Sequence, residues 1–85
     1  MGWRVELSPG VERELRGLES RVRARILRAF IRLETDQRPP GAKKLKGADD
    51  LWRVRVGDYR IVYQIQNLIL VVLVVRIAHR REAYR

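Results

Sequence analysis

The sequence predicts an α+β fold with the element order β-α-α-β-β-β, in which a helical hairpin packs on one face of a small, mainly antiparallel four-stranded sheet. Three observations favour this fold: two stretches of helical period in the first half, three strand-like segments in the second half, and prolines that separate the halves. With 85 residues, 46% of them hydrophobic, the chain is long enough for one core and too short for two. We therefore expect residues 1–85 to form a single domain.

The first half of the chain is expected to hold one strand and the helical hairpin. Residues 2–7 alternate apolar and polar side chains, which is typical of a strand with one buried face. Ser8 and Pro9 match the preferences for the N-cap and first turn of a helix, which we expect to end near Leu18. Ser20 is placed to cap a second helix. The apolar stripe of this second helix comprises Val22, Ile26, Phe30 and Leu33.

The second half of the chain is expected to form the rest of the sheet. Pro39 and Pro40 cannot continue a helix, so a loop that carries several lysines must lead into the strands. The three strands are expected at Leu51–Val56, Tyr59–Ile65 and Leu68–Ile77. Gly57-Asp58 suits a two-residue hairpin turn, and Gln66-Asn67 is expected to form the next turn. The last segment is almost continuously apolar and rich in β-branched residues, which predicts an interior strand.

The hairpin turn at Gly57-Asp58 decides which side chains share a face, because a two-residue turn pairs Arg55 with Arg60 and sets the register beyond them. One face then carries the aromatic residues expected in the core: Trp52, Tyr59 and Tyr63. The opposite face carries Arg53, Arg55 and Arg60. Like charges directly opposite each other destabilise a sheet, so the cluster favours an anionic ligand. A merely solvated outer face would show the same alternation.

The charge balance points to the same kind of ligand. There are 19 Lys and Arg residues against 10 Asp and Glu, a formal net charge of +9, and all but three of the cations are arginine. Such an excess on a small domain repels itself in the folded state, and a polyanionic partner is the commonest reason for it. Nucleic acid is the first expectation, and an acidic protein or an anionic membrane is the alternative.

Several classes of chemistry and location are excluded by the composition. The chain has no cysteine and a single histidine, His79, so we expect no metal site and no cofactor. The start of the chain lacks the apolar region of a signal peptide. The longest apolar run, Leu68–Val75, is far shorter than the roughly 20 residues that span a bilayer. A cytoplasmic protein without membrane contact is expected.

Four segments carry a further pattern: Lys44–Gly47, Leu51–Val56, Gly57–Ile65 and His79–Tyr84. Together they closely resemble the RelE family of bacterial and archaeal toxins, within the RelE/ParE superfamily of type II toxin–antitoxin systems. The resemblance covers nearly the whole chain. It implies a single RelE-like toxin domain that acts as a metal-independent, ribosome-dependent endoribonuclease, cleaving messenger RNA in the A site of the 30S subunit. It also implies a cognate RelB-like antitoxin that holds the toxin inactive.

The resemblance assigns roles to individual residues. The positions that match the family's catalytic residues are Arg53, Arg55, Arg60, Arg80 and Tyr84, with His79 as a further candidate. The basic residues expected only to bind RNA are Lys43, Lys44, Lys46 and Arg81. Arg53 and Arg55 stand where the family usually has lysine, a change that keeps the charge but not the ability to release a proton.

The chemistry of the family reaction separates these roles further. The 2′-hydroxyl of RNA attacks the adjacent phosphorus and leaves a 2′,3′-cyclic phosphate and a 5′-hydroxyl. Arginine stays protonated, so the arginines suit clamps on the phosphate. Tyr84 is the preferred general base, because neighbouring cations lower the pKa of a phenol. His79 is the alternative, because imidazole titrates closest to neutral pH.

Two other functions fit the same residues. The first is a ParE-like inhibitor of DNA gyrase, which binds a protein and has no catalysis of its own. The clustered arginines and the C-terminal tyrosine count against it, since a protein without catalysis needs neither. The second is a non-catalytic domain that binds RNA or DNA, in which Tyr84 would have no role.

Overall fold

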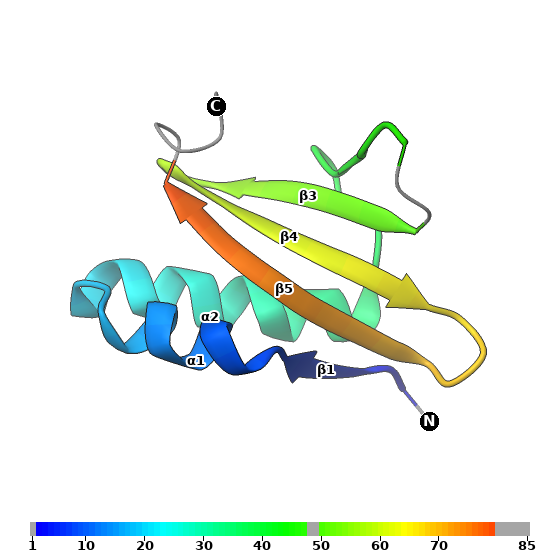
Figure 1. The fold of residues 1–85 in the computed structure, drawn as a ribbon, viewed down its shortest axis with the longest axis horizontal. Helices are drawn as coiled ribbons and strands as arrows, with labels where there is room; N and C mark the ends of the chain where they lie inside the picture. Colours follow the sequence, from blue (N-terminus) through cyan, green and yellow to red (C-terminus); the bar gives the residue numbers. More distant parts are fainter. Residues whose placement is uncertain (1, 48–49, 80–85) are drawn as a thin grey trace.

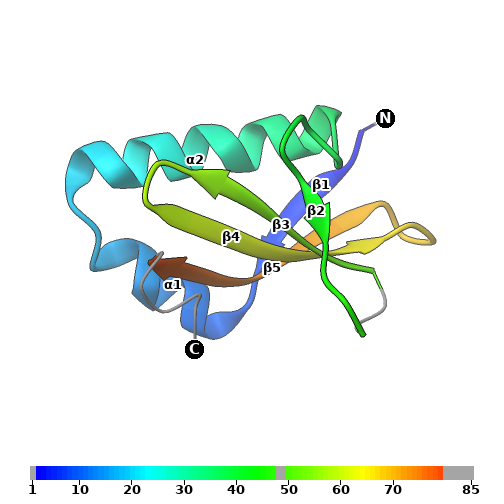
Figure 2. The same ribbon diagram turned by 90° about the horizontal axis from the view of Figure 1, so that it is seen from above.

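A computed structural model describes residues 2–47 and 50–79, which form two helices and a five-stranded sheet. The elements in chain order are β1 (Arg4–Leu7), α1 (Pro9–Arg16), α2 (Ser20–Thr35), β2 (Lys43–Lys44), β3 (Leu51–Val56), β4 (Tyr59–Gln66) and β5 (Val71–His79). The strand order is β1-β5-β4-β3-β2, with β1 parallel to β5 and all other neighbours antiparallel. Both helices lie beneath the sheet in Figure 1, and Figure 2 looks down on its other face.

The predicted class and the order of its elements are confirmed, but the sheet has five strands instead of four. The additional strand, β2, lies in the segment predicted as a loop, where Lys43 pairs with Arg53 and Lys44 pairs with Trp52. Two consecutive lysines show no apolar alternation, so the sequence gives no signal for this strand. It forms because β3 offers an unpaired edge to which the chain can add backbone hydrogen bonds.

The helix boundaries agree with the sequence except at one cap. Ser8 is the N-cap of α1 and Pro9 is its first helical residue, as predicted, and the helix ends at Arg16. The predicted role of Ser20 as a cap is wrong, because Glu19 is the N-cap of α2 and Ser20 is already helical. Neither N-cap side chain hydrogen-bonds to the helix, so side-chain capping does not set where α1 and α2 begin.

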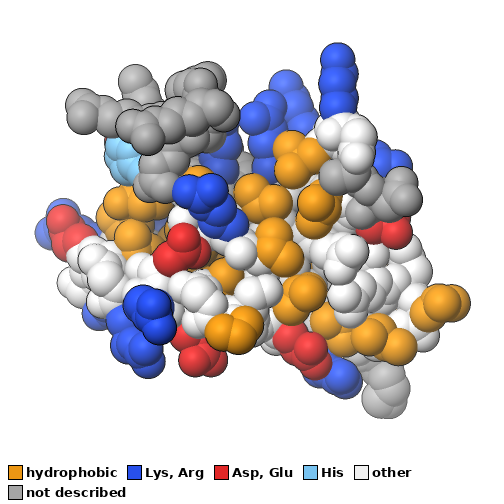
Figure 3. All heavy atoms as spheres, viewed as in Figure 1, with side chains coloured by type: hydrophobic (Ala, Val, Ile, Leu, Met, Phe, Trp, Pro, Cys, Tyr) orange, Lys and Arg blue, Asp and Glu red, His pale blue; other side chains and the backbone are white. Residues whose placement is uncertain are grey.

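The connection between β4 and β5 is longer than predicted. The last strand was expected from Leu68, but residues 67–70 form a turn and β5 begins at Val71, which pairs with Gln66. Leu68 is fully exposed and Ile69 is 60% exposed, and apolar side chains are visible at this end of the molecule in Figure 3. Hydropathy alone cannot distinguish an exposed apolar turn from the start of a buried strand.

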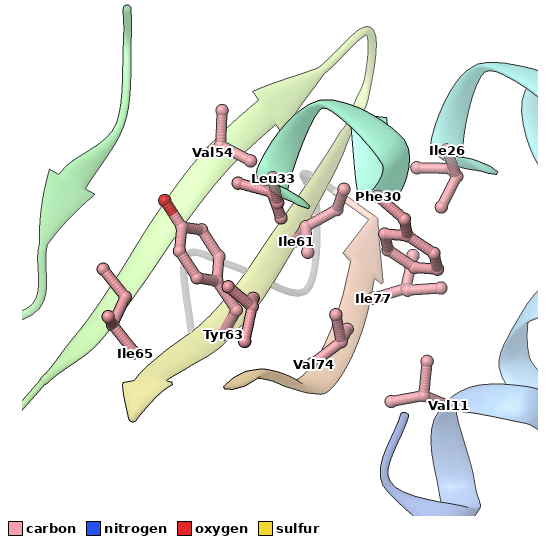
Figure 4. Close-up of a cluster of buried hydrophobic side chains, with 11 residues drawn as sticks. Val11, Ile26, Phe30, Leu33, Val54, Ile61, Tyr63, Ile65, Val74 and Ile77 are labelled. Atoms are coloured by element: carbon pink, nitrogen blue, oxygen red, sulfur yellow. The ribbon is translucent and has the colours of Figure 1, made fainter. Parts of the chain in front are cut away.

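The core lies between the helices and the inner face of the sheet (Figure 4). As predicted, β5 is an interior strand, placed between β1 and β4. Tyr63 is completely buried, and Trp52 and Tyr59 pack against the same cluster, so the assignment of these aromatic residues to the core is confirmed. Complete burial of an aliphatic side chain such as Ile61 contributes about 1.5–3 kcal/mol.

Tyr63 also ties the sheet to the loop that follows α2. Its hydroxyl donates a hydrogen bond of 2.9 Å to the backbone carbonyl of Gln37. Burial raises the pKa of Tyr63 from the usual 10 to about 12, while the nearby Arg38 guanidinium opposes the shift and the Asp36 carboxylate adds to it. The folded protein therefore holds this phenol in its neutral form.

We expect the stability of the protein to fall between pH 10 and pH 12 through Tyr63. The unfolded chain loses the phenol proton near pH 10 and the folded chain only near pH 12, so alkali favours unfolding, by up to roughly 2–3 kcal/mol. Urea unfolding at a series of pH values measures this loss. Tyr63→Phe should be about 1–2 kcal/mol less stable at pH 7, because the Gln37 carbonyl loses its donor, and should lack this part of the alkaline loss. An equal alkaline loss in the variant would contradict the assignment.

A β-bulge interrupts the pairing of β4 with β5. Tyr63 pairs with Val74 but Val62 pairs with Arg76, so Val75 is the additional residue. β1 ends opposite Val74, and beyond that point α1 lies against β5. There the carboxylate of Glu14 accepts a hydrogen bond of 3.0 Å from the backbone N–H of Ile77. A helix side chain thus satisfies a backbone donor of β5 past the end of β1.

Glu14→Ala is expected to lower the free energy of unfolding by about 1–3 kcal/mol, because it leaves a partly buried N–H without an acceptor. Glu14→Gln keeps a side-chain carbonyl oxygen and should lose clearly less. Urea unfolding of the three proteins side by side measures both differences. An alanine variant as stable as wild type would show that this hydrogen bond contributes nothing.

Candidate nucleic-acid interface

The outer face of the sheet carries a cluster of arginines fixed by the hairpin register. The structure confirms the predicted pairing of β3 with β4, in which Arg55 lies opposite Arg60 and Arg53 lies opposite Val62. The alternate residues of the same strands point into the core, and Ile61 is completely buried. The three guanidinium groups therefore lie on the side of the sheet away from the helices. Lys and Arg side chains project from this side in Figure 3.

These arginines surround a hollow of about 160 Å³, lined by Gly41, Lys43, Arg53, Arg55 and Arg60. The volume is several times the roughly 30 Å³ that a water molecule occupies in the liquid, which leaves room for a phosphate group. Gly41 has a φ of +90°, a backbone conformation that favours glycine, and it lets the loop after α2 close one side of the hollow. The described lining is one glycine and four cations.

Arg55 is held by the hairpin turn. Its Nε donates a hydrogen bond of 3.0 Å to the backbone carbonyl of Gly57. Gly57 has a φ of +59° and Asp58 has no positive φ, which is the pattern of a two-residue turn that begins with glycine. The turn therefore fixes both the strand register and the direction of one guanidinium group.

The arginines of β3 carry their charge on this face without a carboxylate partner among the described residues. Within the described ranges, Arg53 and Arg55 make no salt bridge. Arg4 pairs with Glu6 at 2.8 Å, but both residues are on β1, at the opposite edge of the sheet. Arg55 and Arg60 are directly opposed, so their like charges cost stability unless an anion lies between them. The guanidinium groups gathered on this face have the planar donor geometry that suits a phosphate group.

The three lysines predicted to bind RNA do not share one position. Lys43 pairs with Arg53 and lines the hollow. Lys44 pairs with Trp52, so it faces the other side of the sheet edge, and Lys46 is exposed in the turn after β2. Only Lys43 joins the arginine cluster, and the other two add charge around it.

His79 lies on the inner face instead of the arginine face. It pairs with Tyr59 at the end of β5, and the two rings meet edge to face with their centroids 5.1 Å apart and an interplanar angle of 88°. On the outer face, Arg60 pairs with Ala78. This geometry gives His79 a packing role at the end of the core. The predicted site residues Arg80, Arg81 and Tyr84 lie outside the described residues.

Arg76 is a basic residue that sequence reasoning missed. Val72 and Val74 point into the core, and simple alternation along β5 would send Arg76 there too. The bulge at Val75 reverses this, so Arg76 pairs with Val62 and lies exposed on the arginine face. One feature of the sequence could have identified Arg76: it is the one charged residue inside the apolar strand β5, where a charged side chain would not be expected to point into the core.

Two findings concern other classes of site. No group of three or more metal-ligating side chains occurs within residues 2–47 and 50–79. Neither described helix has the length and apolar character that crossing a bilayer requires. The four cations that line the hollow can neutralise phosphate charge and orient a phosphodiester.

Sequence comparisons relate this chain to toxins of known families. The family model for the ParE toxin of type II toxin–antitoxin systems, parDE, matches residues 5–84. A protein of Methanocaldococcus jannaschii named "Putative toxin RelE1" is 27% identical, over 100% of this chain and 98% of that protein.

Solved structures show the same fold. The RelE–RelB complex from Pyrococcus horikoshii contains a chain that superposes with a TM-score of 0.84 and 29% identity, covering 94% of this chain and 97% of that one. The isolated RelE toxin of E. coli superposes with a TM-score of 0.80 and 26% identity, covering 96% and 90% of the two chains.

Proposed function

Because this chain belongs to the ParE toxin family of type II toxin–antitoxin systems and has RelE toxins among its relatives, we propose that it cleaves messenger RNA in the A site of the ribosome and so inhibits translation. Such a toxin acts in the cytoplasm, where ribosomes are. The observation that carries the proposal is the arginine-lined hollow on the outer face of the sheet. A toxin that only bound a protein would not need like charges opposed across two strands.

In the proposed reaction, the 2′-oxygen forms a bond to phosphorus, the bond from phosphorus to the 5′-oxygen breaks, and a cyclic phosphate and a 5′-hydroxyl result. Arg53, Arg55 and Arg60 neutralise the charge that develops on the phosphate oxygens. Tyr84, as the phenolate, accepts the proton of the 2′-hydroxyl, the leaving 5′-oxygen takes up a proton from water, and Arg80 adds to the clamp. No metal is needed for any step, since the cations of the chain supply the charge.

The proposal includes an antitoxin partner. The relative from Pyrococcus horikoshii was solved as a complex with RelB. A RelB-like partner of this chain is expected to be acidic overall, because it must associate with a protein of net charge +9.

A purified translation system programmed with a defined messenger tests the function. Primer extension should map cuts in the A-site codon only when ribosomes are present, and the products should carry a cyclic phosphate and a 5′-hydroxyl. The family model names ParE toxins, so the second candidate is a gyrase inhibitor. Inhibition of DNA supercoiling without RNA cleavage, by protein shown to be folded, would overturn the proposal in favour of that candidate.

A further inference from the structure

The pairing of five strands orders the cations of the outer face into rows. One row crosses the sheet through Lys43, Arg53, Val62 and Arg76, on β2, β3, β4 and β5 respectively. The next row contains Arg55 and Arg60. Neighbouring rows on one face are about 6.6 Å apart along the strands, and neighbouring strands are about 4.8 Å apart.

Val62 lies at the centre of a triangle of arginines. Arg53 and Arg76 flank it on the two neighbouring strands, and Arg60 precedes it by two residues on β4. Arg76 and Arg60 are diagonal neighbours, a relation in which Cβ atoms lie about 7–8 Å apart and long side chains can reach a common point. Because valine is short, three guanidinium groups can converge above it.

This triangle adjoins the hollow and extends beyond it on the β5 side. The hollow lies on the β2 side of the cluster and its described lining does not include Arg76 or Val62. Arg53 and Arg60 belong to both groups, because each of them lines the hollow and is also a corner of the triangle. Two adjoining positions for an anion thus lie on one face of the sheet.

We infer that Arg76, together with Arg53 and Arg60, forms a second phosphate subsite above Val62, which binds the phosphate next to the one held in the hollow. The inference rests on the proposed action on RNA. The bulge at Val75 is what makes the subsite, because without it Arg76 would point into the core. The Glu14 carboxylate, bound to the N–H of Ile77, holds the backbone immediately after Arg76.

The salt dependence of binding to a single-stranded RNA oligonucleotide tests the subsite. The oligonucleotide carries 2′-O-methyl groups throughout, so binding is measured without cleavage. Each phosphate contact contributes about 0.7 to the slope of log affinity against log salt for single strands. Arg76→Ala should reduce the slope by about that amount and weaken binding several-fold at low salt. Arg76→Lys should retain most of both.

Arg4→Ala is the matched control. Arg4 is also exposed on the sheet, but it lies on β1 and is paired with Glu6, so its loss changes the net charge without removing a phosphate contact. Arg53→Ala provides a positive control from the shared part of the cluster. Thermal unfolding of each variant reports folding, and Arg76→Gln replaces the alanine variant if that variant is unfolded.

The outcomes separate the subsite from the proposed function. An unchanged slope in the Arg76 variant, beside a reduced slope for Arg53→Ala, would overturn the subsite even if the protein cleaves messenger on the ribosome. No binding of the oligonucleotide by wild type would overturn it as well. A reduced slope in a protein that does not cleave messenger would support the subsite and count against the nuclease. An equal reduction for Arg4→Ala would assign the effect to net charge and overturn the subsite.

Discussion

Arg60→Ala is expected to lower the rate of A-site messenger cleavage by about 10²–10³-fold, the usual effect of removing one group that stabilises charge in a transition state. Arg60 lies on β4 directly opposite Arg55 and lines the hollow, which places it to contact the scissile phosphate in the proposed reaction. Single-turnover cleavage on programmed ribosomes measures the rate, and titration of the toxin measures ribosome affinity.

Arg60→Lys separates charge from geometry in this experiment. Lysine keeps the positive charge but not the planar, bidentate guanidinium group, so its rate should lie between those of wild type and the alanine variant. Arg4→Ala should cleave at the wild-type rate, because Arg4 is paired with Glu6 away from the cluster. A folded Arg60→Ala variant that cleaves as fast as wild type would remove the arginine face from the chemistry.

The part of this face that could be predicted depends on local rules. Strict alternation over residues 51–56 and a Gly-Asp turn set the register of β3 and β4, and that register placed Arg53, Arg55 and Arg60 together. The stripe on α2 similarly predicted its buried face, because Ile26, Phe30 and Leu33 recur at helical spacing.

The rest of the fold depends on partners that are distant in the sequence. β2 exists only through its pairing with β3, and the turn between β4 and β5 is set by the pairing of Gln66 with Val71. The sequence around the bulge at Val75 contains no glycine or proline that would predict an irregularity in the strand. It reverses the orientation of Arg76 and could not be read from the pattern of a continuous apolar run.

The position of His79 also depends on strand pairing that the sequence pattern does not reveal. In the sequence it stands next to the basic C-terminal residues, and this proximity made it a candidate base. The pairing of β5 with β4 instead places His79 on the same face of the sheet as Tyr59, away from the arginines. Chain proximity is therefore a poor guide to a shared site at the end of a strand, where successive residues point to opposite faces.

The two candidate bases can be separated by mutation. Tyr84→Phe is expected to lower the single-turnover cleavage rate by about 10²–10⁴-fold, the usual contribution of a positioned general base. Ribosome affinity should change little, because phenylalanine keeps the ring and removes only the hydroxyl. His79→Gln should leave the rate close to that of wild type, because the ring of His79 packs on Tyr59. A large loss for His79→Gln with none for Tyr84→Phe would reverse the assignment.

The pH dependence of the rate gives an independent criterion. Imidazole ordinarily titrates near pH 6.5 and phenol near pH 10, so a histidine base would give a rate that levels off just above neutral pH, whereas a tyrosine base would give a rate that still rises with pH. Ala78 pairs with Arg60, so the end of β5 lies beside the central arginines. Because cations favour the phenolate, Arg60→Ala should raise the pH at which the rate levels off, an effect that simple loss of binding would not produce.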